Sequence, residues 1–360
     1  MPDERRVRVI AIVLSISNGG ATHPHHPRMD PSAYRSLTTK RGLKYNYFVV
    51  HGTDSAKPAL LFIHGFPSTS YDWRHQVPFF RAHGFTVIVP DMLGYGGTDK
   101  PTEVEKYKFS GMAADMIDIL DAENVAPGRA VAIGHDWGSG LTCRIANYYP
   151  ERFLGFAFLS VGYSPPSTSG TFTHFLDHLK GLFGYELFGY WLFFSEEGAD
   201  KIIEEHWDSF INIVYPSDPA YWRTDLAPVG ALKAWVLADR ALPPVSYLTE
   251  ADKKHMKESI RDLGIAGPLN WYKVMTSGLS AEDNKQIPQE RYTVQQPTFF
   301  GAAMRDYVCV PELFAKALCP NLTWRGFDAD HWVQLAQPDE LNRELLAWID
   351  GIREVQPARM

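Results

Sequence analysis

Short apolar runs alternate with helix-like segments along much of the chain. The run at residues 59–63 is apolar throughout and lies between a proline and a glycine, which is typical of a strand buried in a parallel sheet. Residues 109–121 instead place their apolar side chains at helical spacing. By the same patterns we expect strands at 43–50, 85–89, 130–133, 156–161, 298–303 and 322–327, and helices at 71–83 and 338–352. Strands that alternate with helices predict an α/β fold with a mostly parallel, doubly wound sheet.

The alternation breaks between residues 164 and 286, where the sequence is loop-rich at first and then mostly helical and aromatic. The strand pattern resumes after this segment. We therefore expect a sheet domain made of residues 29–163 and 287–360, interrupted by a helical cap at 164–286. Ligands of open α/β sheets bind beyond the carboxyl ends of the strands, which is where such a cap would lie.

Residues 1–28 differ from the rest of the chain. Three arginines precede a short apolar run, and a stretch rich in histidine and proline follows. We interpret this segment as a disordered extension and expect a cytoplasmic protein, with a secretory signal as the alternative. The apolar run is too short to span a bilayer, and no other run of about 18 apolar residues exists, so no transmembrane helix is expected.

Composition and charge restrict the class of partner. The 360 residues are 45% hydrophobic and 21% charged, with a net charge of −7, so there is no electrostatic case for binding nucleic acid or an anionic membrane. The three cysteines match no metal-binding spacing. We expect them to be reduced thiols, and a Cys309–Cys319 disulfide is the alternative for a secreted chain.

The candidate chemistry begins where the apolar run 130–133 ends, in the sequence Gly-His-Asp-Trp-Gly. Glycines on both sides of Asp136 indicate a nucleophile elbow, a sharp strand-to-helix turn that lifts one side chain to the top of the sheet. In esterases that side chain is a serine. A carboxylate attacks saturated carbon and forms an ester that water can later cleave. Asp136 therefore predicts the opening of a carbon–oxygen or carbon–halogen bond.

A carboxylate nucleophile needs a base that activates water for the second step, and an acid that orients this base. In such folds the order along the chain is nucleophile, acid, histidine. Asp306 follows one of the last two predicted strands and His331 follows the other. Both lie at strand ends, where a rigid sheet can place them beside Asp136. Asp328 and Asp330 are alternatives for the orienting acid, although residues so close to the histidine in one loop seldom face it.

A second turn, His64-Gly65-Phe66-Pro67, follows the predicted strand 59–63. Its glycine permits a close backbone approach, and its proline fixes the turn, with a cis peptide as one option. In this position the backbone N–H groups of Phe66 and Trp137 would form an oxyanion hole. The alternative is a plain strand-to-loop turn with no catalytic role.

Taken together, these motifs resemble those of the soluble and microsomal epoxide hydrolases of the α/β-hydrolase fold. The resemblance runs from about Met29 to the C-terminus. It rests on His64-Gly65-Phe66-Pro67, Gly94-Tyr95-Gly96-Gly97-Thr98-Asp99, Gly134-His135-Asp136-Trp137-Gly138-Ser139, Asp306-Tyr307-Val308 and Asp330-His331-Trp332. The resemblance implies an α/β-hydrolase fold with a cap and the conversion of apolar epoxides to vicinal diols through an ester on Asp136. It implies no metal or organic cofactor.

Epoxide hydrolases also use two cap tyrosines, which bind and protonate the oxygen of the ring. An epoxide opens only if its alkoxide is stabilised as it forms, so a donor opposite the nucleophile is required. The segments Phe-Gly-Tyr-Trp-Leu-Phe-Phe and Asn-Trp-Tyr resemble those of the family and nominate Tyr190 and Tyr272. Tyr163 and Tyr185 are alternatives to the first of these. The residues expected to contact the apolar substrate are Phe66, Trp137 and Trp191.

Two other functions stay open. Haloalkane and haloacid dehalogenases share most of these motifs, and Trp137 could donate to a halide. The former usually add an asparagine, where this chain has Phe66, or a second tryptophan from the cap. Candidates for the latter are Trp191, Trp207, Trp222, Trp235 and Trp271. Fluoroacetate dehalogenases place an arginine shortly after the nucleophile, where Gly140 stands and Arg144 follows one turn later. A ligand-binding homologue without turnover would usually lack a triad member. We therefore expect a monomeric or dimeric epoxide hydrolase whose substrates are an apolar epoxide and water.

Overall fold

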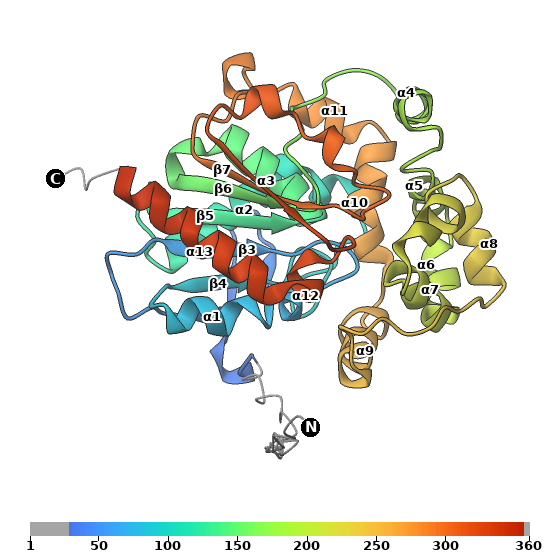
Figure 1. The fold of residues 1–360 in the computed structure, drawn as a ribbon, viewed down its shortest axis with the longest axis horizontal. Helices are drawn as coiled ribbons and strands as arrows, with labels where there is room; N and C mark the ends of the chain where they lie inside the picture. Colours follow the sequence, from blue (N-terminus) through green and yellow to red (C-terminus); the bar gives the residue numbers. More distant parts are fainter. Residues whose placement is uncertain (1–28, 356–360) are drawn as a thin grey trace, which may run out of the picture.

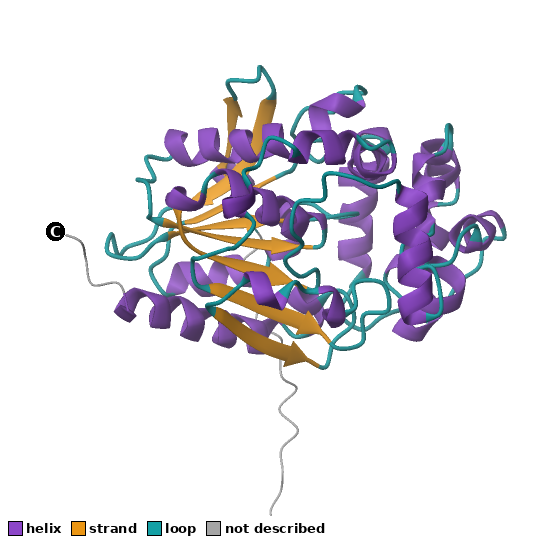
Figure 2. Ribbon diagram, turned by 90° about the horizontal axis from the view of Figure 1, so that it is seen from above, coloured by secondary structure: helices purple, strands orange, loops and turns teal. Residues whose placement is uncertain are grey.

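The computed structural model describes residues 29–355 and contains an eight-stranded sheet with helices on both faces (Figures 1 and 2). The strand order is β1-β2-β4-β3-β5-β6-β7-β8, in which β2 pairs antiparallel with both of its neighbours and the other pairs are parallel. The strands are β1 (Tyr34–Thr38), β2 (Lys44–Val50), β3 (Ala59–Ile63), β4 (Val87–Pro90), β5 (Ala130–His135), β6 (Phe153–Leu159), β7 (Thr298–Ala303) and β8 (Leu322–Phe327). This architecture confirms the predicted α/β class with a mostly parallel, doubly wound sheet.

Thirteen α-helices accompany the sheet within the described residues. Five belong to the sheet domain, namely α1 (Gln76–Ala82), α2 (Phe109–Ala122), α3 (Trp137–Tyr148), α12 (Val333–Ala336) and α13 (Pro338–Val355). The others lie between β6 and β7, namely α4 (Phe172–Phe183), α5 (Tyr190–Ser195), α6 (Ala199–Glu205), α7 (Trp207–Val214), α8 (Ala231–Leu237), α9 (Glu250–Met256), α10 (Ala266–Thr276) and α11 (Leu279–Asn284). None of the described helices is long and apolar enough to cross a membrane.

Two predicted elements differ from the structure for local reasons. The helix expected at 71–83 is present but shorter, because a 3-10 turn over Ser70–Trp73 precedes α1. Pro78 falls in the first turn of α1, where proline is tolerated, so the helix begins just before it. The strand expected at 156–161 is displaced toward the N-terminus, and it ends before Ser160 because that residue has a left-handed backbone with φ of 60°.

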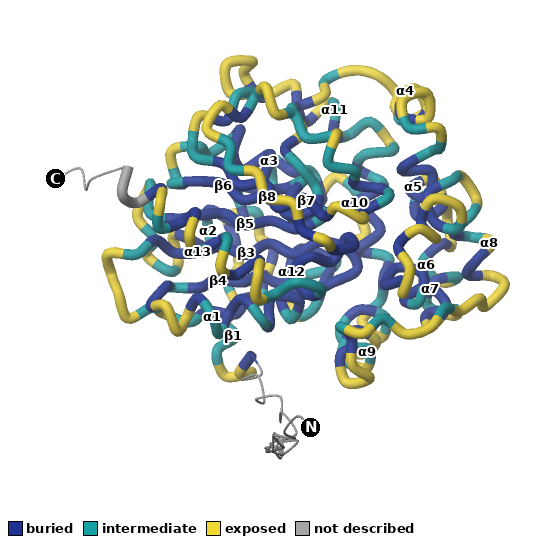
Figure 3. The backbone as a smooth tube through the Cα atoms, in the orientation of Figure 1, coloured by how far each residue is buried: buried dark blue, intermediate teal, exposed yellow. Residues whose placement is uncertain are grey.

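The strands separate two apolar cores, one on each face of the sheet (Figure 3). Leu61 and Ile63 of β3 join the core that contains buried residues of α2 and α3, whereas Leu60 and Phe62 join the core that contains residues of α1 and α13. The first core also contains buried residues of α5, α7 and α10. The insertion is therefore packed continuously with one face of the sheet rather than joined to it by a few contacts.

The inserted helices α5 to α9 gather beyond the carboxyl ends of the parallel strands, with α10 between them and the sheet (Figure 1). Helix α10 packs against α5, and α11 packs against α2. The exact division at residues 164 and 286 stays a prediction. The disordered extension expected at residues 1–28 lies outside the described residues.

Candidate active site

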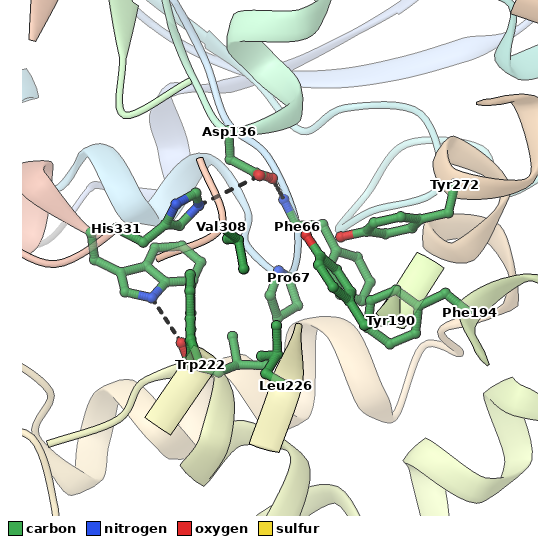
Figure 4. A pocket seen from close by; sticks show the side chains of 12 residues that line it. Phe66, Pro67, Asp136, Tyr190, Phe194, Trp222, Leu226, Tyr272, Val308 and His331 are labelled. Atoms are coloured by element: carbon green, nitrogen blue, oxygen red, sulfur yellow. Dashed lines mark hydrogen bonds and ion pairs between the residues drawn. The ribbon is translucent and has the colours of Figure 1, made fainter. Parts of the chain in front are cut away.

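A strained turn between β5 and α3 carries Asp136. Its φ of 54° and ψ of −124° lie outside the regions that non-glycine residues ordinarily adopt. The neighbouring strands leave no room for larger residues around it: a Cβ on Gly138 would lie 2.0 Å from the carbonyl oxygen of Ile63, and one on Gly134 would lie 2.3 Å from that of Gly138. The glycines therefore permit this elbow, and it aims the Asp136 carboxylate toward the cap (Figure 4).

Asp136 lies beside a buried histidine–aspartate pair. Nε2 of His331 is 3.4 Å from Oδ2 of Asp136, and its Nδ1 donates to Oδ2 of Asp306 over 2.6 Å. The other oxygen of Asp306 accepts the backbone N–H groups of Val308 and Cys309, both at 2.9 Å. These bonds fix the acid in place, so the imidazole is held with Nε2 facing the Asp136 carboxylate.

The backbone of His331 is anchored by two residues that the sequence analysis missed. Its carbonyl oxygen accepts Oγ of Ser160 at 2.6 Å and Nε2 of His135 at 2.8 Å. Burial, followed by the positive charge of His331, lowers the pKa of His135 to about 3, so this ring is neutral and donates through Nε2. Ser160 is the residue with the left-handed backbone at the end of β6, a signal that only the structure reveals.

The charges within the triad influence one another. Burial lowers the pKa of His331, but the carboxylates of Asp306 and Asp136 outweigh it and hold that pKa well above its usual value. Burial raises the pKa of Asp136, and the hydrogen bond and charge of His331 reverse this and lower the pKa below its usual value. Asp136 is thus an anion next to an imidazolium.

Backbone donors meet the Asp136 carboxylate on its other side. The N–H of Phe66 donates to Oδ1 over 2.7 Å (Figure 4). Trp137 is the first residue of α3, so its N–H has no partner within the helix and contributes to the positive end of the helix dipole. A Cβ on Gly65 would lie 2.2 Å from Oδ1 of Asp136 and 2.7 Å from the nitrogen of Trp137, so only glycine allows this approach. The peptide bond between Phe66 and Pro67 is cis.

Two tyrosines of the insertion face the nucleophile. Tyr190 begins α5 and Tyr272 lies in α10, and their ring centroids are 6.1 Å apart. Figure 4 shows both hydroxyls directed at the space in front of Asp136. Burial, with the Asp136 carboxylate as a further cause, raises the pKa of both well above the usual value, so they are neutral donors. Tyr185 and Tyr163, the alternatives to Tyr190, instead donate their hydroxyls to backbone carbonyls.

Two cavities meet at Asp136 and Tyr190, which line both. The smaller has a volume of about 30 Å³ and lies against His331, and Phe66 and Tyr272 are also in its wall. The larger has a volume of about 290 Å³, and its wall includes Trp137 and Trp191. The small chamber can hold one water molecule, whereas the large one has room for an organic molecule.

The rival acids for the histidine point elsewhere. Asp328 is exposed and pairs with Arg305 over 2.9 Å. Asp330 accepts the hydroxyl of Tyr247 at 2.7 Å and the backbone N–H of Trp332 at 3.0 Å. Neither carboxylate contacts His331 in the way Asp306 does.

Within residues 29–355, one group of side chains has ligand atoms close enough for a metal ion, namely Asp306, Cys309 and His331. The aspartate and the histidine are already joined by a hydrogen bond of 2.6 Å. Burial raises the pKa of the Cys309 thiol to about 12, which disfavours the thiolate that a metal requires. The histidine–aspartate pair therefore explains the grouping. All three cysteines are free, so the alternative of a Cys309–Cys319 disulfide is wrong.

Comparison with known proteins places this site in a family. Residues 58–187 match the model of the α/β-hydrolase fold. Epoxide hydrolase srdG of Neurospora crassa is 30% identical over 348 residues, which cover 90% of this chain and 96% of that protein. Bifunctional epoxide hydrolase 2 of Sus scrofa is 30% identical over 334 residues, and there the match covers 89% of this chain but only 56%, about half, of the relative.

Solved structures agree with these matches. Epoxide hydrolase A from Mycobacterium thermoresistibile superposes with a TM-score of 0.72 at 28% identity, over 88% of this chain and 98% of that one. An epoxide hydrolase from an endophytic Streptomyces superposes with a TM-score of 0.76 at 27% identity, over 89% and 96%. The chain therefore belongs to the epoxide hydrolase family of the α/β-hydrolase fold.

Proposed function

We propose that the protein hydrolyses apolar epoxides to vicinal diols through an ester on Asp136. One observation carries the proposal: the buried carboxylate of Asp136 faces two protonated tyrosine hydroxyls where the small and large cavities meet, with His331 beside it. An epoxide between them would meet an anion at one ring carbon and two hydrogen-bond donors at its oxygen. The named relatives are epoxide hydrolases, which supports the same chemistry.

In the first step, an oxygen of Asp136 attacks a ring carbon, and the bond between that carbon and the ring oxygen breaks. The developing alkoxide takes hydrogen bonds and a proton from Tyr190 and Tyr272, which are neutral because burial raises their pKa. The product is a hydroxyalkyl ester of Asp136. The phenolic donors make ring opening possible because an alkoxide is otherwise a poor leaving group.

In the second step, water attacks the ester carbonyl. Once Asp136 is esterified its negative charge is gone, which removes one of the causes that hold the pKa of His331 high. The imidazolium can then give its proton to the tyrosinate left by the first step, and the neutral imidazole accepts a proton from water in the small chamber, with Asp306 stabilising the imidazolium that forms again. The N–H groups of Phe66 and Trp137 stabilise the oxyanion. The bond between the ester carbonyl carbon and the substrate oxygen then breaks, the departing alkoxide takes the proton of the new Asp136 carboxyl group, and the diol leaves with Asp136 restored as an anion.

A dehalogenase is the second candidate, and one indole favours it. Nε1 of Trp191 is buried and has no hydrogen-bond partner among the described residues, so its N–H is available to donate to a halide. The ring stacks on Phe172 with an interplanar angle of 4° and lies 4.9 Å from Trp137. However, the tyrosine pair occupies the position opposite Asp136 that a halide would need, which favours the epoxide.

The decisive experiment measures mass and turnover together. Purified protein is given styrene oxide in one arm and a bromoalkane in the other, and diol and halide are followed. We expect diol only. His331→Gln should accumulate a covalent adduct whose mass increase equals that of the whole epoxide, because the ester forms but water is not activated. Asp136→Asn should give neither adduct nor diol on first exposure.

Asp328→Asn is the matched control, since it neutralises an exposed acid three residues before His331 and should keep wild-type turnover. Halide without diol would support the dehalogenase. Turnover by the wild type without any adduct in His331→Gln would contradict the covalent route. A folded wild type that turns over neither compound would favour a ligand-binding homologue.

A further inference from the structure

One face of α3 forms a wall of the large cavity. Asp136 precedes this helix, and Trp137, Gly140 and Arg144 follow at positions that a helix brings to the same side. All four line the cavity. The rise of an α-helix places Arg144 about 12 Å along the helix axis from Asp136. Because helical side chains lean back toward the N-terminus, the guanidinium of Arg144 and the carboxylate of Asp136 are on the order of 10 Å apart.

Gly140 keeps the path between these two charges open. A Cβ there would already touch the rings of Phe109 and Trp137, each at 3.4 Å. A longer side chain would project into the cavity at half the distance between Asp136 and Arg144. The cavity is therefore continuous from the nucleophile to the arginine.

Arg144 is a buried cation whose hydrogen-bond partners are neutral. It is only 5% exposed, and its guanidinium donates to Oδ1 of Asn284 at 3.2 Å and to the carbonyl oxygen of Ser164. Among the described residues it forms no ion pair. Asp283, the acid next to Asn284, is occupied by the backbone N–H and hydroxyl of Ser110, at 2.9 and 2.5 Å.

A buried charge without a counter-charge is costly to fold around. Since the protein supplies no carboxylate to Arg144, an anionic ligand in the cavity would relieve that cost. A guanidinium binds a carboxylate with two parallel hydrogen bonds, so this is the anion it fits best. Arg144 thus has the properties of a ligand-binding group in addition to its bonds to the insertion.

The remainder of the wall suits an alkyl chain. Between the two charged ends the cavity is lined by Phe109, Val161, Phe175, Phe188, Trp191 and Met275. Its volume of about 290 Å³ is about twice that of a roughly 150 Å³ cavity able to bind benzene, so an alkyl chain fits. Asp136 and Arg144 are on the order of 10 Å apart, and a contact of about 3 Å at each end leaves room for a chain of about six carbons.

We propose that Arg144 binds the carboxylate of an epoxy acid, and that the preferred substrates carry an anionic group about six carbons from the end that Asp136 attacks. The inference rests on the proposed epoxide hydrolysis for its substrate class. It adds Arg144, a substrate-binding residue that lies outside the five motifs on which the family resemblance rests. The acid end enters the cavity at Arg144 while the epoxide reaches the two tyrosines.

The test compares 5,6-epoxyhexanoic acid with its methyl ester, which has the same chain and epoxide but no charge. In the wild type we expect kcat/KM for the acid to exceed that for the ester by about 10- to 100-fold, the range for a hydrogen-bonded charge. Arg144→Gln should remove this preference, and Arg144→Lys should keep part of it. Arg305→Gln, which removes an exposed arginine, is the matched control and should keep the full preference.

A binding measurement makes the outcome independent of turnover. Titration calorimetry with hexanoate and with hexanol should show hexanoate bound about 10-fold or more tightly in the wild type and lose that difference in Arg144→Gln. Equal use of acid and ester by the wild type, together with equal binding of hexanoate and hexanol, would overturn the role of Arg144. Hexanoate preference in a protein that opens no epoxide would instead overturn the proposed function and leave the anion site standing.

Discussion

At the scale of single residues, the proposed ring opening depends on the hydroxyls of Tyr190 and Tyr272, and it can be tested at each of them. Replacing either by phenylalanine keeps the ring packing and removes one donor. We expect each change to lower kcat for diol formation by about 10²- to 10³-fold, the usual effect of losing one oxyanion donor. Single-turnover mass spectrometry should show that formation of the ester is the step that slows.

Tyr185→Phe provides the comparison, because that hydroxyl donates to the carbonyl of Tyr307 and does not face Asp136. It should cost about 1 kcal/mol of unfolding free energy and leave kcat within a few-fold of the wild type. If Tyr190→Phe and Tyr272→Phe behaved in the same way as this variant, protonation of the epoxide oxygen would have to come from another group.

The candidate triad could be predicted from sequence because each of its residues belongs to a short local motif. Asp136 is flanked by the glycines of the elbow, and the other two members follow strand ends. The supporting contacts could not be predicted in this way. Ser160 and His135 reach the backbone of His331 over 171 and 196 residues, so no local pattern connects them. The cavity position of Arg144 likewise depends on which face of α3 the insertion covers.

At the scale of elements, the buried strands were predictable and one of the two edge strands, β1, was not. β3 and β7 have the expected bounds because strands covered on both faces are continuous apolar runs. β1 (Tyr34–Thr38) has no buried residue and exists through its antiparallel pairing with β2. Its sequence, Tyr-Arg-Ser-Leu-Thr, carries no apolar run. The strand is defined by its hydrogen bonds to β2 and not by burial, so the pattern of apolar residues does not reveal it.

The elbow is the element on which the site depends, and Gly138→Ala tests it. The added methyl group would lie 2.0 Å from the carbonyl oxygen of Ile63, a backbone atom that cannot move without shifting β3. We expect a loss of about 3 kcal/mol or more in unfolding free energy, measured by urea denaturation. Any folded fraction should form less ester, because α3 would move away from β3 and carry the Trp137 N–H with it.

Gly351→Ala is the control for that variant. Gly351 lies in α13, and nothing stands within 4 Å of the position its Cβ would take. Alanine there should stabilise the protein by about 0.5–1 kcal/mol, because it restricts the unfolded chain and favours the helix. Equal effects of the two substitutions would show that the elbow tolerates a side chain, which would contradict the packing argument.

At the scale of the whole molecule, the insertion is joined to the sheet domain by buried charges around Arg74. Asp252 of α9 lies 3.3 Å from Nε of Arg74 and accepts the hydroxyl of Tyr71. Burial raises the pKa of Asp252, but Arg74 and Thr249 outweigh it and lower the pKa overall. For Asp72, on the sheet side, burial prevails over Arg74 and raises the pKa to about 7. Ionisation of Asp252 therefore stabilises the folded protein, whereas ionisation of Asp72 destabilises it.

Asp72→Asn and Asp252→Asn should consequently shift stability in opposite directions at pH 8. Between about pH 4 and 7 folded Asp72 keeps a proton that the unfolded chain has lost, so the unfolding free energy falls as pH rises through this range. At pH 8 its buried carboxylate costs on the order of 2–4 kcal/mol, and asparagine removes that cost. The carboxylate of Asp252 stabilises the fold above about pH 4 and loses its effect as pH falls further, so asparagine there should cost about 1–3 kcal/mol at pH 8.

Urea unfolding of the wild type and the two variants at pH 4 and pH 8 measures both signs, since urea adds no charge. The gain from Asp72→Asn should vanish toward pH 4. A loss from Asp72→Asn at pH 8 equal to that from Asp252→Asn would mean that Asp72 is a charged partner of Arg74, and that both acids hold the insertion in place.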